Sequence, residues 1–136
     1  MKTSDFQFST PLLSEFEFYI NNEYDADGEE IDVSLKILVN KERVEEREAV
    51  VELTVEIGEK DDSAPFYIKA TEGALFKWKE NAFNGEHDID NLLDINAPAL
   101  LVSYLRPIVS GITAASKYPS YNIPFINFNE AKKEPQ

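Results

Sequence analysis

The stretch that most constrains the fold of this chain is residues 96–116, NAPALLVSYLRPIVSGITAAS, which holds one charged residue, Arg106, in a chain that is 29% charged. Its large apolar side chains recur at spacings of three and four residues, the period of one face of an α-helix. Asn96 can cap the start of this helix, and Pro98 stands where a missing N–H costs nothing. The apolar face comprises Leu100, Leu101, Tyr104, Leu105, Ile108, Val109 and Ile112.

The opposite face of this predicted helix is small and neutral, and a helix without a charged face is usually covered on both sides. A chain of 136 residues with one sizeable helix has little material of its own for the second side. We therefore interpret it as an oligomerisation helix; the alternative is a helix in a groove of its own subunit. A kink is expected at Pro107. The residues expected at the oligomer interface are Leu101, Leu105, Ile108, Val109 and Ile112.

Upstream of the helix, alternation of apolar and polar residues predicts antiparallel strands, each with one apolar and one largely charged face. The charged connection KERVEERE is expected to be a solvated hairpin tip, and a bulge or kink is expected at Glu72-Gly73. The apolar face needs a cover. The sequence predicts an α+β fold, a four-stranded antiparallel sheet backed by one long C-terminal helix. The four predicted strands lie in residues 6–20, 31–40, 49–57 and 66–78.

The net charge and the residue composition limit the classes of partner that the chain is expected to bind. Thirteen Lys and Arg against 26 Asp and Glu give a net charge of −13, which repels phosphate backbones and anionic lipid, so we expect no nucleic-acid partner. The absence of cysteine excludes disulfides, a thiol nucleophile and cysteine metal sites. Without an apolar run of eighteen residues or a cleavage signal, we expect a cytoplasmic protein with no membrane insertion. We expect a single domain over residues 1–136, with a mobile tail at 130–136.

Two acidic segments contain residue types that metal or catalytic sites use. Residues 80–95 read as irregular and contain the one histidine, His87, beside carboxylates. No second histidine, HExxH-like spacing or candidate nucleophile accompanies it, so we expect a surface histidine, no enzyme and no cofactor. Residues 25–28 faintly resemble a calcium loop, but the further ligand positions are missing and a solvated loop is the better interpretation.

Residues 118–128, YPSYNIPFINF, are dense in aromatic residues and prolines and carry no charge. A loop of this composition must pack on something. Either it is anchored on the sheet of its own subunit, or it forms the wall of an apolar groove shared with a client.

Residues 96–113 and 117–131 together resemble the C-terminal half of the SecB-type protein-export chaperones. Upstream, Phe66-Tyr67-Ile68 followed by Gly73-Ala74-Leu75-Phe76 is similar to the fourth strand of that family. The linear order of several motifs carries the resemblance. In this chain they are Ala97-Pro98, Leu100-Leu101, Tyr104, Arg106, Tyr118-Pro119, Asn122-Ile123, Pro124 and Ile126-Asn127-Phe128.

The resemblance implies a dimer of dimers with the long helices between the sheets. It also implies an ATP-independent holdase that keeps unfolded preproteins soluble in apolar grooves and hands them to the translocation ATPase. Glu15 and Glu17 would belong to the acidic sheet face that docks this ATPase, although a solvated strand face explains them as well. The implied groove residues, for which core packing is the alternative, are Phe76, Trp78, Tyr104, Tyr121, Ile123, Phe125 and Ile126.

Eight residues follow Phe128, so the second helix and tail of the family are expected to be short or absent. This weakens the expectation of ATPase handover more than that of holdase activity. A dedicated chaperone of one partner, such as an antitoxin, and a non-chaperone oligomeric adaptor remain the alternatives.

Overall fold

A computed structural model describes residues 5–25, 32–80 and 85–129, apart from the side chains of residues 86 and 87. The calcium-like loop, the predicted tail and the side chain of His87 therefore lie wholly or partly outside the described residues. The elements in chain order are β1 (Phe6–Phe8), β2 (Leu12–Ile20), β3 (Leu35–Glu45), β4 (Glu48–Gly58), β5 (Phe66–Trp78), α1 (Glu86–Asn91), the π-helical turn η1 (Leu92–Asn96) and α2 (Ala97–Ala114).

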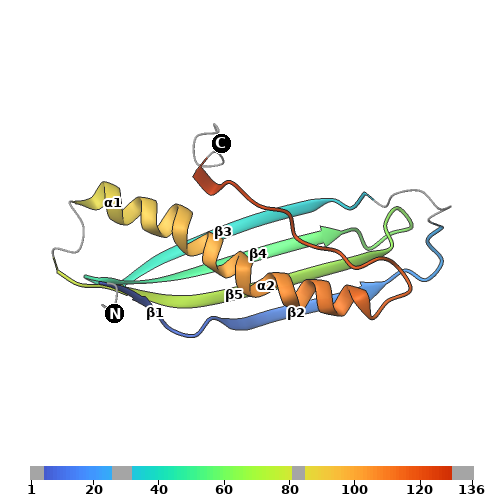
Figure 1. Ribbon diagram of the computed structural model, residues 1–136, viewed down its shortest axis with the longest axis horizontal. Helices are drawn as coiled ribbons and strands as arrows, with labels where there is room; N and C mark the ends of the chain where they lie inside the picture. The colour runs from blue at the N-terminus through green and yellow to red at the C-terminus, as the bar shows by residue number, and fades with distance from the viewer. Residues whose placement is uncertain (1–4, 26–31, 81–84, 130–136) are drawn as a thin grey trace.

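The strands form one antiparallel sheet in the order β1-β5-β4-β3, and β2 also pairs with β5, on the same side as β1 (Figure 1). The predicted class, an antiparallel sheet backed by one long helix, is confirmed. The described residues contain five strands rather than four, because the first predicted strand is divided before Leu12. Pro11 is buried at the division, and a proline cannot donate a ladder hydrogen bond.

The predicted interruption of the last strand is wrong. β5 runs unbroken through Glu72 and Gly73, and the irregularity lies in its neighbour β2, between Leu13 and Glu15. The extra residue is Ser14, whose hydroxyl donates to the backbone oxygen of Thr71 at 3.4 Å. The glycine thus marks a close approach of strands rather than a bend, since a Cβ there would lie 3.1 Å from the side chain of Glu52.

The charged connection is largely exposed, as predicted, but most of it continues β3 instead of forming a tip. Residues 41–45 pair with the start of β4, and only residues 46–47 form the turn. The alternation of inward and outward side chains continues through residues 41–45. The side chains of Lys41 and Arg43 therefore lie on the inner face at this end of the sheet. Lys41 pairs with Asp94 at 2.6 Å, and the guanidinium of Arg43 lies 5.0 Å from the ring of Trp78.

The long helix begins ten residues earlier than predicted, because residues 86–95 are helical rather than irregular. Asn96 lies inside the helix, with φ −72° and ψ −42°, and caps nothing. Ile89, Leu92 and Leu93 extend the apolar spacing upstream, which accounts for the earlier start. At η1 the Ala97 N–H bonds to the oxygen of Leu92, a wider turn that accommodates the proline ring one residue later.

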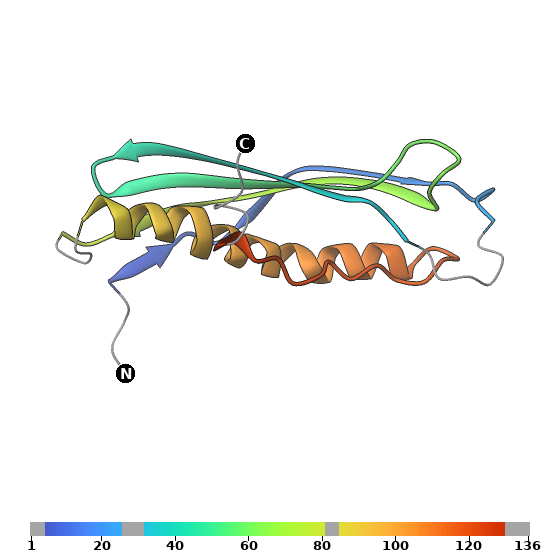
Figure 2. The same cartoon turned by 90° about the horizontal axis from the view of Figure 1, so that it is seen from above.

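The helix crosses one face of the sheet diagonally, from the side of β3 to the side of β2, and the extended segment after it runs back alongside (Figures 1 and 2). Leu101, Leu105 and Val109 are fully buried in the core of their own subunit, so the prediction that they form an oligomer interface is wrong. Ile108 and Ile112 are half-buried.

Length and composition alone would allow the helix from Asp88 to Ala114 to span a membrane, since its most apolar 18 residues have a mean hydropathy of 1.3. That stretch is 44% buried inside the molecule, where its side chains pack on β4 and β5. Core packing accounts for its apolar character.

Candidate functional site

Three of the predicted groove residues belong to the core. Phe76 has no exposed surface, and Trp78 and Ile123 are buried. Two rings of β1 cover Phe76: Phe6 is stacked on it with 5.5 Å between ring centroids, and Phe8 lies 6.1 Å away. For these three positions the core-packing alternative describes the structure.

The other predicted groove residues do not share one surface. Tyr121 and Ile126 are half-buried, and the ring of Tyr121 meets Phe66 edge-on at 6.3 Å. Tyr104 is exposed on α2, and Phe125 is 86% exposed on the segment after the helix. The structure therefore does not bring the predicted set together as one groove wall.

The segment after α2 is anchored on its own subunit. Arg106 donates from Nε to the oxygen of Ile123 and from its terminal nitrogen to that of Pro124, both at 3.1 Å. The Tyr121 N–H donates to the hydroxyl of Thr113 at 2.8 Å. These bonds, two of them charge-assisted, tie the extended chain along the helix of its own subunit, whereas the anchoring alternative had named the sheet.

Apolar surface is exposed elsewhere, on the inner, helix-facing side of β1 and β2 where the diagonal helix leaves a corner of the sheet uncovered. Phe8, Leu13 and Phe16 are 41%, 42% and 36% exposed. Register places them opposite Phe76, Glu72 and Ala70 of β5, all on the inner face. We call these three side chains the open edge. Sequence reasoning missed it because alternation shows which residues face inward but not which strand lies at the margin.

A buried carboxyl adjoins the open edge. Glu72 is 3% exposed, pairs in register with Leu13 and Leu53, and its Oε2 has no hydrogen-bond partner among the described residues. Burial raises the pKa of the Glu72 carboxyl above its ordinary value. A polar group of this kind on an apolar face is unfavourable to the isolated subunit.

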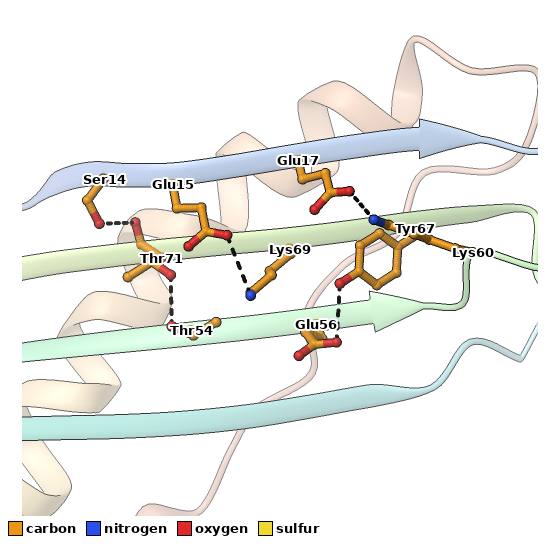
Figure 3. A network of polar contacts seen from close by, with 9 residues as sticks. All are labelled: Ser14, Glu15, Glu17, Thr54, Glu56, Lys60, Tyr67, Lys69 and Thr71. Atoms are coloured by element: carbon orange, nitrogen blue, oxygen red, sulfur yellow. Dashed lines mark hydrogen bonds and ion pairs between the residues drawn. The ribbon is translucent and has the colours of Figure 1, made fainter.

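The outer face of the sheet carries the two predicted docking glutamates, and both are paired (Figure 3). Glu15 lies 3.5 Å from Lys69, and Glu17 forms an ion pair with Lys60 that raises the pKa of that lysine. This part of the outer face presents neighbouring charges of both signs, which offset one another.

The described residues assemble no candidate metal site. No group of three or more His, Asp or Glu side chains there could hold a metal ion. The arrangement offers apolar surface and strand edges, which suit binding of polypeptide rather than bond breaking.

Comparison with models of known protein families shows to which family the chain belongs. The family described as preprotein translocase subunit SecB matches residues 15–134, nearly the whole chain. The chain belongs to the SecB family. The resemblance drawn from the sequence is thereby confirmed. SecB-family chaperones are non-enzymatic, bind polypeptide clients and are typically soluble and cytoplasmic.

The chain is also similar to individual proteins and solved structures. An uncharacterised protein of Methanocaldococcus jannaschii, MJ0357, is 27% identical over 126 residues, covering 89% of this chain and 78% of that protein. Among solved structures, the SecB-like chaperone Rv1957 of Mycobacterium tuberculosis, in complex with a ChAD peptide from the HigA1 antitoxin Rv1956, has a TM-score of 0.72 at 12% identity. That match covers 89% of this chain and 90% of the chaperone chain. It shows a shared SecB-like fold.

A protein of unknown function from Streptococcus agalactiae matches less well, with a TM-score of 0.48 and 11% identity over 91% of this chain and all of that chain. A similarity of that size adds nothing to the SecB assignment.

Proposed function

We propose that this SecB-family chain is an ATP-independent holdase that binds unfolded polypeptides through its inner sheet face. The observation that carries the proposal is the open edge, where Phe8, Leu13 and Phe16 expose apolar surface beside a complete core. Monomeric proteins rarely leave such side chains together in water without a partner.

The open edge suits an unfolded client for a physical reason. A client exposes apolar side chains and unpaired backbone groups. The open edge can bury the first, and β2, which among the described strands pairs only with β5, offers its other margin for the second. Neither contact reads a defined sequence, as a holdase requires.

A dedicated chaperone of one partner is the second candidate. It is favoured by the similarity to Rv1957, whose solved structure holds an antitoxin peptide. A general holdase and a dedicated chaperone could use the same surface, so they differ in client range rather than in mechanism.

Assembly through the helix forms part of the proposal, in a corrected form. The buried leucines serve the subunit core, and the outward face of α2 is the uncharged surface that a second copy would cover. A dimer of dimers in the cytoplasm, as in the resemblance, remains our proposal. The exposed residues on the outward face of α2 are Ala99, Ser103, Tyr104, Pro107, Gly111 and Ala114.

Docking of the translocation ATPase on the outer face would require existing ion pairs to break. The carboxylates of Glu15 and Glu17 already have lysine partners, so a basic partner would have to displace Lys69 and Lys60. The proposal that the protein takes part in preprotein export therefore rests on its membership of the SecB family.

The test is aggregation of two unrelated, chemically unfolded proteins after dilution without ATP. Near-stoichiometric protein should suppress both, and the double variant Leu13→Ser/Phe16→Ser should lose most of that protection. The control is Leu38→Ser, since Leu38 is exposed on the outer face of β3. Equal protection by both variants would place the client elsewhere. Protection of neither protein would end the general holdase proposal and leave a dedicated partner to be sought.

A further inference from the structure

β1 is a strand of three residues that the chain lays along β5 beyond the end of β2. Its two phenylalanines alternate with Gln7, so both rings lie on the inner face and the glutamine on the outer one. The register pairs Phe6 with Trp78, Gln7 with Lys77 and Phe8 with Phe76.

The two rings fill the apolar surface above Phe76. Their centroids lie 5.5 and 6.1 Å from that of Phe76, which has no exposed surface as a result of such contacts. Phe8 itself stays substantially exposed and belongs to the open edge. An extended segment with aromatic residues at alternate positions is therefore already bound at one end of the proposed client surface.

Besides its pairing with β5, the segment is held by a bond from the Leu75 N–H to the hydroxyl of Ser9 at 3.0 Å and by backbone bonds at both of its ends. The Ser9 N–H donates to the oxygen of Leu75 at 2.8 Å, and the Lys79 N–H donates to that of Asp5 at 3.1 Å. These bonds join backbone groups, so any extended chain can make them. The ion pair of Lys79 and Asp5, at 3.6 Å, is largely exposed and contributes little.

We propose that β1 is a built-in occupant of the client surface, which an extended client segment with aromatic side chains at alternate positions displaces from β5. The inference rests on the proposed function, because it names the conformation and side chains of the client at that surface. In the free protein β1 shields Phe76 and Trp78 from water. On displacement, these two predicted groove residues become available to the client.

The fraction of molecules in which β1 is docked on β5 determines the apparent affinity of the protein for a client. A ligand that binds only the open form has its affinity reduced by the fraction of protein in that form. If β1 is docked in about nine molecules of ten, its release strengthens client binding about tenfold.

A disulfide can test this within one protein. Gln7 and Lys77 are directly opposed in register, and facing residues of antiparallel strands lie within the Cα separation that a disulfide spans. The chain has no cysteine, so Gln7→Cys/Lys77→Cys forms a single bridge that fixes β1 to β5 when oxidised. The reduced form of the same protein is the matched control.

The probe is a fluorescent peptide of the chain's own residues 5–10, Asp-Phe-Gln-Phe-Ser-Thr. We expect the reduced protein to bind it and the oxidised protein, in which β1 cannot leave β5, to lose this binding almost completely, by well over tenfold. Phe6→Ala, which loosens β1 without removing a residue of the open edge, should bind it up to about tenfold more tightly than the unsubstituted chain, with folding checked by circular dichroism. The peptide Asp-Gln-Phe-Phe-Ser-Thr, in which the alternation is broken, should bind less well.

The outcomes separate the two proposals. Equal affinity of the oxidised, reduced and alanine variants would overturn the displacement of β1, as would failure of every form to bind the probe. If the reduced protein still suppresses aggregation in either case, the holdase proposal stands. If it neither binds the probe nor suppresses aggregation, both fail.

Discussion

Glu72 lies on the inner face of the sheet with a carboxyl oxygen that has no partner among the described residues. Because burial raises its pKa, the folded chain retains this proton to a higher pH than the unfolded chain does. Above the unfolded pKa the folded state binds more protons, so Glu72 makes stability fall as pH rises, until the folded pKa is passed.

Glu72→Gln should therefore be more stable than the unsubstituted chain at pH 8, and the advantage should vanish below about pH 4, where both states hold the proton. Urea unfolding at a series of pH values measures this. Glu52→Gln, at an exposed site of β4, serves as the control. An advantage that does not change with pH would show that the titration of Glu72 is not responsible.

Alanine substitution at two glycines should change the stability of the fold in opposite directions. Gly58 has φ +77°, and a Cβ there would lie 2.0 Å from the backbone oxygen of Phe66. Gly58→Ala should destabilise the fold by about 1–3 kcal/mol. At Gly111 a Cβ meets nothing within 4 Å, so Gly111→Ala should stabilise the helix by about 1 kcal/mol. Chemical unfolding of both variants measures the two effects. Losses of equal size would contradict the structural distinction.

At the scale of elements, Arg106 fastens the extended segment after α2 through two carbonyl oxygens. Arg106→Lys keeps the charge but not the planar fork, and should weaken the attachment by about 1–3 kcal/mol. Chymotrypsin cleavage after the exposed Phe125 should then accelerate about tenfold for each 1.4 kcal/mol lost, while Lys36→Gln on β3 should leave it unchanged. An unaltered cleavage rate in Arg106→Lys would mean that other contacts hold the segment.

Local periodicity predicted the strands well where burial is one-sided. The apolar residues that alternate along β4 are all fully buried, because a period of two fixes the face once one side is covered: Ala49, Val51, Leu53, Val55 and Ile57. Alternation could not show that Pro11 divides the first strand or that Ser14 is the extra residue in β2, since both depend on pairing with a strand far along the chain. The start of the helix was missed because its acidic residues hid the spacing of Ile89, Leu92 and Leu93.

The candidate site was predicted less well than the fold. An aromatic residue looks the same in sequence whether it lines a groove or fills a core, so Phe76 and Ile123 were chosen and proved to be buried. The open edge depends on strand order and on the diagonal course of the helix, and neither is encoded in any short segment.

For the whole molecule, the helix face that points away from the sheet predicts self-association. Leu105→Glu would place a charge in the core and unfold the subunit, whereas Ile108 is half-buried on the helix. Ile108→Glu should convert the oligomer to smaller species with the circular dichroism spectrum retained, as measured by light scattering at micromolar concentration. Leu38→Glu, on the outer face of the sheet, should leave the mass unchanged. A monomeric unsubstituted chain would contradict the assembly.

The pairing of the first strands with the last also determines when they can fold. Ser14 and Thr71, which bond across β2 and β5, are 57 residues apart, whereas β4 can pair with the preceding strand β3 as soon as it is made. A ribosome makes the chain from its N-terminus, so β1 and β2 emerge long before the strand that receives them. Throughout that interval Phe6, Phe8 and Phe16 are carried on an unpaired, extended segment. Each newly synthesised molecule thus passes through a stage in which it exposes the kind of surface that its family exists to protect.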